Sequence, residues 1–328
     1  MISSRFKIMR DVTVAFVDFW PAFDAKNNFI LDVLRQKYNV ETVAASDCPD
    51  ILFYSYFGIE NLRHTEPVRV YFTGENDVPD FNLCDYAISF HHLSFANRHL
   101  RLPLYVIYSC FNDLRNGRIH QCEDTENRDF CSIVVSNVKN SDMARLDFFN
   151  LLSGYKQVAS GGRFANNVGG CVADKLSFIS GYKFNIAFEN SRVEGYVTEK
   201  IIEAFSSGTL PIYWGDPLVA NEFNHKAFID VSKFDSLDAA VKFVAALDNN
   251  REQYLEILNQ PPLLNNPFLN WEEMLLDFLT PIVNELKKYR VDTGAIGTAY
   301  RHKMSREQIY NIVTLKKPFE LFKHLFHS

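Results

Sequence analysis

The sequence lacks any long apolar run. The richest stretch, residues 51–57, is far shorter than the ~18 residues that indicate a membrane-spanning helix. The start of the chain also lacks the apolar core and small-residue cleavage site of a secretory signal. Its six cysteines include no Cys-x-x-Cys pair and no spacing typical of a zinc site. We therefore expect free thiols, a reducing compartment and a cytoplasmic location.

Three motifs of nucleotide chemistry are missing as well. There is no Gly-x-Gly-x-x-Gly and no P-loop, so neither a simple dinucleotide enzyme nor an NTPase is supported. There is also no Asp-x-Asp, the carboxylate pair that metal-dependent sugar-nucleotide enzymes use to hold a cation on a diphosphate. We therefore predict no metal site and no required cofactor.

What is present is an ordinary globular composition, with 47% hydrophobic and 23% charged residues, over 328 residues, a length typical of two domains. The net charge is -6, and we expect no nucleic-acid partner. The charge is unevenly distributed, because residues 287–328 hold nine Lys and Arg against three acids. This basic end suits an anionic surface.

Strand-like and helix-like segments alternate along the chain, which predicts parallel sheets covered by helices. We expect strands at residues 12–19, 50–57, 68–73, 86–90, 130–136, 183–188 and 209–214. We expect helices at residues 22–38, 141–152, 198–207, 237–247, 252–258 and 271–289. A polar stretch around residues 112–129 interrupts the alternation, so we divide the chain into domains 1–122 and 123–290 and a tail, 291–328.

The segment at residues 182–217 carries the densest set of polar side chains. Glu189 and Asn190 follow a buried strand, at the end where open α/β sheets bind ligands. Thr198 then precedes a helix whose first turn holds Glu199 and Lys200. Free N–H groups and a cation at a helix start suit a phosphate, and Glu199 could accept hydrogen bonds from ribose hydroxyls. The alternative is a structural helix whose Lys200 is merely solvated.

The same segment, FNIAFENSRVEGYVTEKIIEAFSSGTLPIYWGDP, resembles the signature of the α-1,3/4-fucosyltransferases, glycosyltransferase family 10, and is most similar to the bacterial members. YFTGENDVPDFNLCDY at residues 71–86 and RLPLY at residues 101–105 resemble a second signature of that family. The resemblance covers about residues 11–290. It implies a GT-B fold, in which two Rossmann-like domains face each other across a cleft, here followed by a C-terminal helical tail.

The resemblance also implies an inverting reaction that moves L-fucose from GDP-β-L-fucose to N-acetylglucosamine or glucose in a galactose-containing acceptor. N-acetyllactosamine and lactose are such acceptors, as in Lewis antigen synthesis. Such a reaction needs a base for the acceptor proton, and Glu75 in the Thr-Gly-Glu-Asn motif is our candidate. The alternative is that Glu75 caps the following turn together with Asn76.

The implied donor-binding residues are six. They are Lys200, Glu199, Tyr196, Asn190, Glu189 and Arg163. Arg163 in SGGRFANN departs from the closest bacterial pattern, where the arginine stands two positions later, at Ala165 here. An exposed loop arginine is therefore the alternative for Arg163, and a core aromatic is the alternative for Tyr196.

The acceptor side is expected to use Trp20, Asn76, His91 and His92. The two histidines stand where bacterial relatives tend to have acids, which bears on acceptor preference. Nothing nearby in the sequence orients either ring, so a neutral surface pair is favoured over a catalytic histidine.

Three further expectations concern the tail and the competing functions. The tail spaces apolar residues at near-helical period among lysines, which favours either an anionic inner membrane face or packing on the protein itself. A GT-B transferase of another GDP-sugar and a non-catalytic glycan-binding protein are the competing functions. Non-essential stimulation by a divalent cation is left open.

Overall fold

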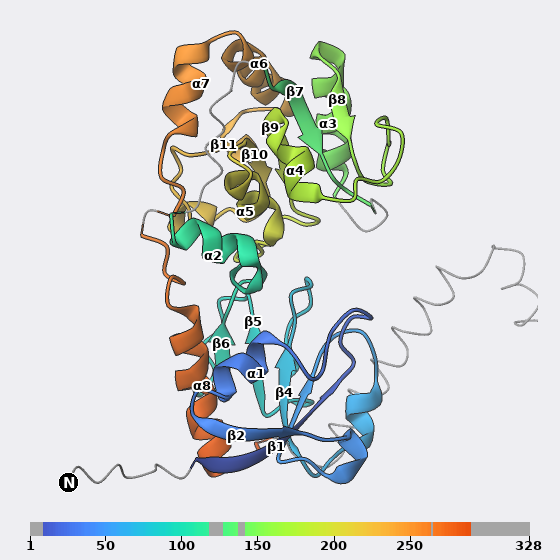
Figure 1. The fold of residues 1–328 in the computed structure, drawn as a ribbon, viewed down its shortest axis with the longest axis vertical. Helices are drawn as coiled ribbons and strands as arrows, with labels where there is room; N and C mark the ends of the chain where they lie inside the picture. The colour runs from blue at the N-terminus through green and yellow to red at the C-terminus, as the bar shows by residue number, and fades with distance from the viewer. Residues whose placement is uncertain (1–8, 118–126, 137–141, 264, 290–328) are drawn as a thin grey trace, which may run out of the picture.

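The computed structural model describes residues 9–117, 127–136, 142–263 and 265–289, which form two α/β lobes (Figure 1). The first lobe contains six parallel strands in the order β2-β1-β3-β4-β5-β6. Their bounds are β1 (Arg10–Val17), β2 (Tyr38–Thr42), β3 (Ile51–Tyr54), β4 (Val68–Phe72), β5 (Tyr86–Ser89) and β6 (His99–Arg101). The helical elements of this lobe are α1 (Phe29–Leu34), η1 (Ala45–Asp47), η2 (Glu60–Arg63) and η3 (Leu104–Ile107).

The second lobe contains five parallel strands in the order β11-β10-β9-β7-β8. They are β7 (Asp129–Ile133), β8 (Val158–Ser160), β9 (Tyr182–Phe188), β10 (Leu210–Trp214) and β11 (Ile229–Asp230). The helical elements of this half of the chain are α3 (Met143–Tyr155), α4 (Lys175–Ser180), α5 (Glu199–Ser206), η4 (Val219–Asn221), η5 (Val231–Lys233), α6 (Leu237–Asp248) and α7 (Arg251–Leu258). Two parallel sheets with helices on their faces are the GT-B architecture that the sequence predicted.

The expected helix at residues 22–38 is wrong in its extent. The observed helix α1 begins only after Asn28, whose side-chain oxygen accepts hydrogen bonds from the backbone N–H groups of Ile30 and Leu31, both at 3.2 Å. Because this cap fixes the start and β2 begins at Tyr38, the helix is confined to six residues. The half-buried aromatic residues before Asn28 lie in turns instead.

Four strands were missed, and all but one are very short. The strands β6 and β8 have three residues each and β11 has two, so no alternation of apolar and polar residues could develop. The strand β2 overlaps the helix expected at residues 22–38 only at Tyr38, and its other residues were in no expected element. The five cysteines in the described part of the chain are free thiols, as expected, and Cys122 lies outside it.

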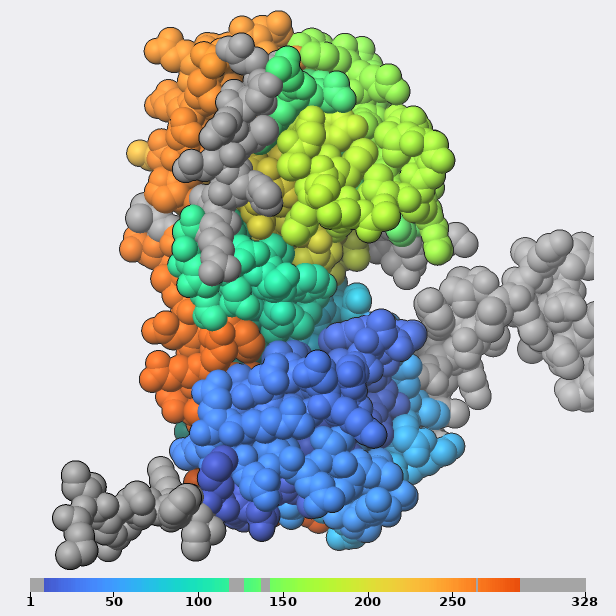
Figure 2. All heavy atoms as spheres, viewed as in Figure 1, coloured from blue at the N-terminus to red at the C-terminus, as the bar shows by residue number. Residues whose placement is uncertain are grey.

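Two segments cross between the lobes. The helix α2 (Ser109–Arg115) packs against α5 of the second lobe, and α8 (Trp271–Glu285) returns to pack against α1 of the first. A single cluster of buried apolar side chains consequently includes residues of both lobes. Figure 2 shows an indentation between the lobes on the side opposite α7 and α8. The division at residues 122 and 123 stays a prediction, and the tail lies outside the described residues.

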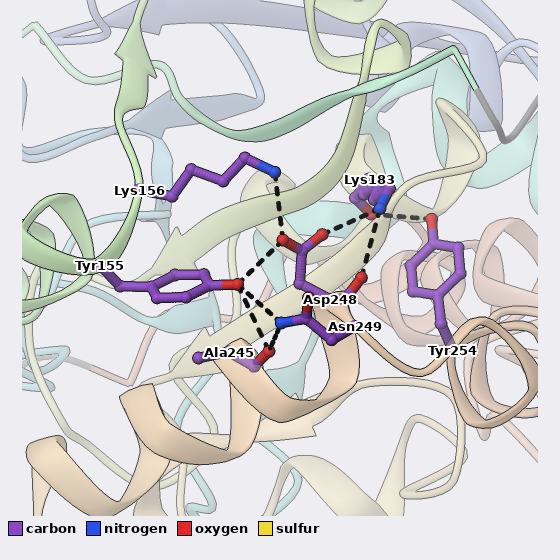
Figure 3. A network of polar contacts seen from close by, with 7 residues as sticks. All are labelled: Tyr155, Lys156, Lys183, Ala245, Asp248, Asn249 and Tyr254. Carbon is purple, nitrogen blue, oxygen red and sulfur yellow. Dashed lines mark hydrogen bonds and ion pairs between the residues drawn. The ribbon is translucent and has the colours of Figure 1, made fainter.

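An ionic network near the surface of the second lobe ties three of its elements together (Figure 3). Asp248, at the end of α6, accepts hydrogen bonds from Lys183 (2.9 Å), Lys156 (3.2 Å) and Tyr155 (3.2 Å). Burial alone would raise the pKa of Asp248, but the hydrogen bonds from Lys183 and Lys156 lower it below its ordinary value. The carboxylate therefore stabilises the fold in its charged form.

We expect Asp248→Asn to lower the free energy of unfolding by on the order of 1–3 kcal/mol, because charge-assisted hydrogen bonds are lost. The pKa of Asp248 is lower in the folded than in the unfolded state. The stabilisation by its carboxylate is therefore fully present above the unfolded-state pKa, and it is lost as the pH falls through the folded-state pKa. Urea unfolding measures the change. Asp238→Asn, which removes an exposed pair with Lys242 in the same helix, should cost far less.

Candidate functional site

The centre of the site is Glu189, which follows β9 at the carboxyl edge of the second sheet. Its side chain is fully buried, and its N–H donates to the carbonyl of Trp214 at the end of β10 (2.8 Å). A side chain on Gly215 would place a Cβ only 2.5 Å from Cγ of Glu189. The neighbouring turn therefore requires glycine so that a carboxylate can be enclosed here.

Glu189 organises the start of α5. Its Oε1 accepts the Thr198 N–H (2.8 Å), and its Oε2 accepts the Thr198 hydroxyl (2.7 Å) and the Lys200 ammonium (3.0 Å). Thr198 occupies the expected N-cap position, but its side chain bonds to Glu189 and Lys200 and does not cap the helix. The first N–H groups of α5 thus lack a side-chain cap and remain suited to an anionic ligand.

Lys200 is held in place by protein groups and is only slightly exposed. Its Nζ bonds to Glu189 and Thr198 and lies 3.7 Å from a carboxylate oxygen of Glu199. Burial alone would lower the pKa of Lys200, but the charges of Glu189 and Glu199 raise it above its ordinary value. Burial would likewise raise the pKa of Glu199, and Lys200 with Lys175 holds it below the ordinary value. Both groups are therefore charged at neutral pH.

Sequence reasoning missed a buried arginine beneath this site. Arg145, on α3, is 1% exposed and donates through Nη2 to the Phe188 carbonyl (2.7 Å) and the Asn190 side-chain oxygen (2.8 Å). Its Nε and Nη1 have no hydrogen-bond partner among the described residues. Burial lowers the pKa of Arg145, and the negative charges of Glu189 and Glu199 oppose that effect. A buried cation with unused donors faces the end of β9.

Arg163, the arginine that the sequence analysis selected, lies elsewhere on the same edge. It follows β8, and β7 separates β8 from β9 in the sheet. Its side chain is exposed, whereas Asn190 is half-buried and contacts Arg145. No motif signalled Arg145, because its role depends on α3 lying under a strand more than thirty residues later in the sequence.

Glu75 comes from the first lobe, in the loop after β4. Its N–H donates to the Thr73 hydroxyl (3.0 Å), and its carbonyl accepts the Asp77 N–H (2.7 Å). The turn is therefore closed by the backbone and Thr73, and the Glu75 carboxylate makes no hydrogen bond within the described structure. Surrounding protein atoms raise its pKa above the ordinary value, Lys200 opposes this, and Glu199 adds to it. Glu75 thus faces the charged start of α5 across the lobes.

Tyr196 contacts the first lobe directly. It is buried, and its ring centroid lies 4.9 Å from that of Phe90, which follows β5. Burial and the charge of Glu189 raise its pKa, and Lys200 and Glu75 also act on it. Tyr196 is therefore both a packed aromatic residue and a neighbour of the charged groups from the two lobes.

The expectation that nothing orients the two histidines is wrong for His91. The ring of His91 is buried and stacks on Phe90 at 3.9 Å, and its Nδ1 lies 3.1 Å from the Ser89 hydroxyl. The same hydroxyl lies 2.9 Å from Nε2 of His99, whose Nδ1 lies 3.2 Å from the Leu93 carbonyl. Burial lowers the pKa of His91, and it lowers the pKa of His99 to about 4.

These contacts show which ring nitrogens of His91 and His99 carry protons. A carbonyl only accepts, so Nδ1–H of His99 donates to Leu93, and Nε2 of His99 accepts the Ser89 hydroxyl proton. The Ser89 oxygen then accepts Nδ1–H of His91. The Nε2 of neutral His91 is left as an acceptor, and it has no partner in the described part of the chain.

His92 is exposed and lies at the contact between the lobes. A Cβ on Gly195, which has a φ of +82°, would lie 2.5 Å from the Phe90 carbonyl and 3.2 Å from the His92 ring. Arg101 reinforces this contact by donating to the Phe90 carbonyl (3.0 Å) and pairing with Glu222 of the second lobe. Burial lowers the pKa of His92, and Arg101 adds to the effect.

The other two expected acceptor residues belong to the first lobe. Asn76 is exposed beside Glu75. Trp20 is half-buried after β1, with its ring 5.0 Å from Phe23 and 6.4 Å from Phe72 of β4. Glu75, Lys200 and Tyr196 thus lie within electrostatic reach of one another, and Trp20, which follows β1, packs against Phe72 at the end of β4.

A second acid on α5 predicts a pH effect on stability. Burial raises the pKa of Glu203 to about 7 despite its ion pair with Lys175 of α4. Because the pKa of Glu203 is higher in the folded than in the unfolded state, its protonation favours the folded state. This contribution is fully present at low pH and is lost as the pH rises through about 7. We expect Glu203→Gln to remove a slope of at most about 1.4 kcal/mol per pH unit between the ordinary glutamate pKa and about pH 7. Urea unfolding at three pH values measures it, and the exposed Glu256→Gln serves as the control.

A metal-binding cluster and a membrane-spanning helix are both absent from the described residues. No group of three or more His, Cys, Asp or Glu side chains is placed to hold a metal ion there. No described helix is long and apolar enough to cross a membrane.

Comparisons with known proteins agree with this geometry. Residues 14–108 match the family described as the alpha-(1,3)-fucosyltransferase FucT N-terminal domain, and residues 125–260 match glycosyltransferase family 10 (fucosyltransferase), C-terminal part. The chain is 35% identical to alpha-(1,3)-fucosyltransferase FucT of Helicobacter pylori over 73% of its own length and 57% of that protein. It therefore spans little more than half of that relative.

A solved structure shows the same fold over nearly its whole length. The crystal structure of an alpha1,3-fucosyltransferase with GDP-fucose superposes with a TM-score of 0.74 at 30% identity, over 88% of this chain and 94% of that one. The mouse 4-galactosyl-N-acetylglucosaminide 3-alpha-L-fucosyltransferase 9 is 35% identical over 38% of this chain and 35% of its own length. The fold is GT-B, and the chain belongs to glycosyltransferase family 10, the fucosyltransferase family.

Proposed function

We propose that this chain is an inverting α-1,3-fucosyltransferase that moves L-fucose from GDP-β-L-fucose to a hydroxyl of a galactose-containing acceptor. The observation that carries the proposal is the meeting of an acid from one lobe with a cationic helix start from the other. Glu75 lies in the electrostatic field of Lys200 and Glu199, and it also acts on Tyr196. A donor held by the second lobe would present its reacting carbon to an acceptor held by the first.

The second lobe supplies the stabilisation of the leaving group. As the bond to fucose breaks, negative charge develops on the departing GDP, and preorganised cations stabilise it. An ammonium has three N–H groups, and Glu189 and Thr198 use two of those on Lys200, which leaves one for a phosphate oxygen. Arg145 adds a second positive charge from below. Glu199, with its lowered pKa, is an acceptor for sugar hydroxyls.

The first lobe supplies the base. Attack on the side of the sugar opposite the diphosphate inverts the anomeric carbon, and the attacking hydroxyl must lose its proton in that step. The Glu75 carboxylate is free of protein hydrogen bonds in the described structure, and its raised pKa improves it as a proton acceptor. Trp20, Asn76, His91 and His92 stay our proposals for acceptor contacts. N-acetyllactosamine and lactose are the first acceptors to test.

The test is GDP release from GDP-fucose with and without N-acetyllactosamine, followed by NMR of the product. Acceptor-dependent release together with a new α-fucosyl signal on the 3-hydroxyl is the expected result. Release from a different GDP-sugar only would favour the competing transferase. Binding of acceptor with no release of GDP would favour a glycan-binding protein instead.

Two further proposals rest on the sequence alone. The basic tail, which lies outside the described residues, would attach a cytoplasmic enzyme to the inner face of the membrane. A chain that ends at Tyr289 should then lose its partitioning to anionic vesicles, and unchanged partitioning would reject this idea. Rate measurements with EDTA and with added Mg²⁺ would test whether a divalent cation stimulates turnover.

A further inference from the structure

The two lobes meet at a close backbone contact beside the site. Phe90 follows β5 of the first lobe, and its carbonyl oxygen would lie only 2.5 Å from a Cβ on Gly195 of the second lobe. Gly195 also has a φ of +82°, a region that favours glycine. The next residue, Tyr196, places its ring 4.9 Å from that of Phe90. The lobes therefore touch here in one defined geometry.

Arg101, at the end of β6, holds this contact together. Its Nε donates to the Phe90 carbonyl (3.0 Å), and its Nη2 pairs with the Glu222 carboxylate of the second lobe. The side chains of Arg101 and Glu222 are only 17% and 3% exposed, so solvent ions screen this pair little. The guanidinium also lies 5.0 Å from the ring centroid of Phe268. One arginine thus joins the loop after β5 to the second lobe.

Glu222 is fixed in its turn by buried polar groups. Asn266, which is buried, donates through Nδ2 to the backbone carbonyl of Glu222 (2.8 Å) and to the hydroxyl of Tyr105 (3.1 Å). Tyr105 belongs to η3 of the first lobe, and its ring lies 5.0 Å from that of Phe223. A shift of Glu222 would therefore disturb buried hydrogen bonds, and the ion pair keeps one position.

The ion pair lies between the parts of the chain that carry the reacting groups. The strands β4, β5 and β6 are neighbours, so Phe90 emerges next to the loop that holds Glu75. In the second lobe, the loop that contains Gly195 leads to Lys200 in the first turn of α5. The separation of Glu75 and Lys200 consequently depends on the contact that Arg101 maintains.

We propose that Arg101 is a positioning residue, which through its pair with Glu222 holds the base and the diphosphate site at the separation that fucosyl transfer needs. The inference rests on the proposed function, and it assigns Arg101 no contact with either substrate. Reacting atoms must approach to ~3–3.5 Å, and a misplacement of ~1 Å can cost about 10²-fold in rate. The ion pair therefore keeps the cleft assembled before the substrates bind.

The first experiment combines steady-state kinetics with calorimetry of GDP binding. Arg101→Gln should lower kcat roughly 10- to 10²-fold and leave the Kd for GDP nearly unchanged, because the cations that we expect to hold the diphosphate lie on the second lobe. Arg101→Lys keeps the charge without the planar guanidinium, and its kcat should lie between those of the wild type and Arg101→Gln. Arg63→Gln breaks an exposed Arg–Glu pair within the first lobe and is the matched control.

The second experiment measures the arrangement of the lobes directly. Cys48 in the first lobe and Cys171 in the second are exposed, whereas the other cysteines in the described part of the chain are buried. Spin labels on these two thiols report the separation of the lobes by pulsed EPR, in a background with Cys122→Ser. The distribution of distances should be narrow with Arg101 present and broader in Arg101→Gln.

A further variant guards against a failure to fold. Removal of Arg101 alone leaves the buried Glu222 carboxylate without its cation, which is destabilising. The double variant Arg101→Gln with Glu222→Gln removes both charges. Its kcat should be no lower than that of Arg101→Gln, since both changes break the same interaction.

Two results would overturn the proposal. One is a wild-type kcat in both Arg101→Gln and the double variant. The other is a lower kcat with an unchanged distribution of distances, because Arg101 would then act within the site. If the wild type transfers no fucose, the proposed function fails, yet a broader distribution in Arg101→Gln would still support the role of the ion pair in holding the lobes, and an unchanged one would reject it.

Discussion

Glu75→Gln should lower kcat by about 10²- to 10⁴-fold, because the amide cannot take the proton of the acceptor hydroxyl. The change should fall on kcat rather than on the KM for GDP-fucose, since the cationic grip of Lys200 lies on the other lobe. The measurement is steady-state kinetics with both substrates varied. A Glu75→Gln enzyme that turns over within a few-fold of the wild type would remove Glu75 from the proton transfer.

The pH profile gives a second measure of the same residue. A base works only when deprotonated, so the rate should rise with pH through the pKa of Glu75, which burial raises above the usual value for glutamate. Glu75→Gln should lose this acid limb. Glu256→Gln changes an exposed acid on α7 of the other lobe, and it should keep both the limb and the rate.

Arg145→Gln should lower kcat/KM for GDP-fucose by roughly 10²- to 10³-fold, the size of effect seen when one preorganised donor to developing charge is removed. The physical reason is the position of Arg145, whose buried guanidinium has two nitrogens without a partner among the described residues. GDP should also bind more weakly in calorimetry. Arg145→Lys keeps the positive charge but lacks the planar guanidinium. Its kcat/KM and GDP affinity should therefore lie between those of the wild type and Arg145→Gln.

Arg163→Gln is the matched control for this experiment. Arg163 lies on the exposed loop after β8, and its replacement should leave GDP affinity nearly unchanged. If Arg163→Gln lost affinity for GDP and Arg145→Gln did not, Arg163 would be the arginine that binds the diphosphate. Thermal unfolding of Arg145→Gln separates a misfolded protein from a folded one, and Arg145→Lys covers the case in which the glutamine variant does not fold.

The sequence predicted the longer strands and most of the longer helices, and it missed the short elements β2, β6, β8, β11, α2 and α4. The four buried strands of the first lobe were found because they are apolar runs between polar turns, as at residues 68–73, where β4 is buried throughout. The end of β1 misled the analysis. The strand expected at residues 12–19 ends at Val17, and the helix expected from residue 22 begins only after its cap Asn28.

The candidate site was only partly predictable, for a physical reason. Glu189, Thr198 and Lys200 lie within twelve residues of one another, so a local motif could reveal them. Arg145 meets the end of β9 only through the packing of α3, and His99 reaches the Ser89 hydroxyl only because β5 and β6 pair. Spacing along a chain carries no record of such contacts, so the sequence analysis did not single out Arg145 or His99.

The apolar cluster shared by the two lobes has a consequence for how the protein melts. Side chains of both sheets and of α8 contribute to this cluster, although the second lobe also has a buried cluster of its own, so loss of packing in the first lobe would expose apolar side chains of the second. We expect a single cooperative thermal transition, and GDP bound to the second lobe should raise the melting temperature of the first lobe with it. A separately expressed half would leave apolar surface uncovered and would be prone to aggregate.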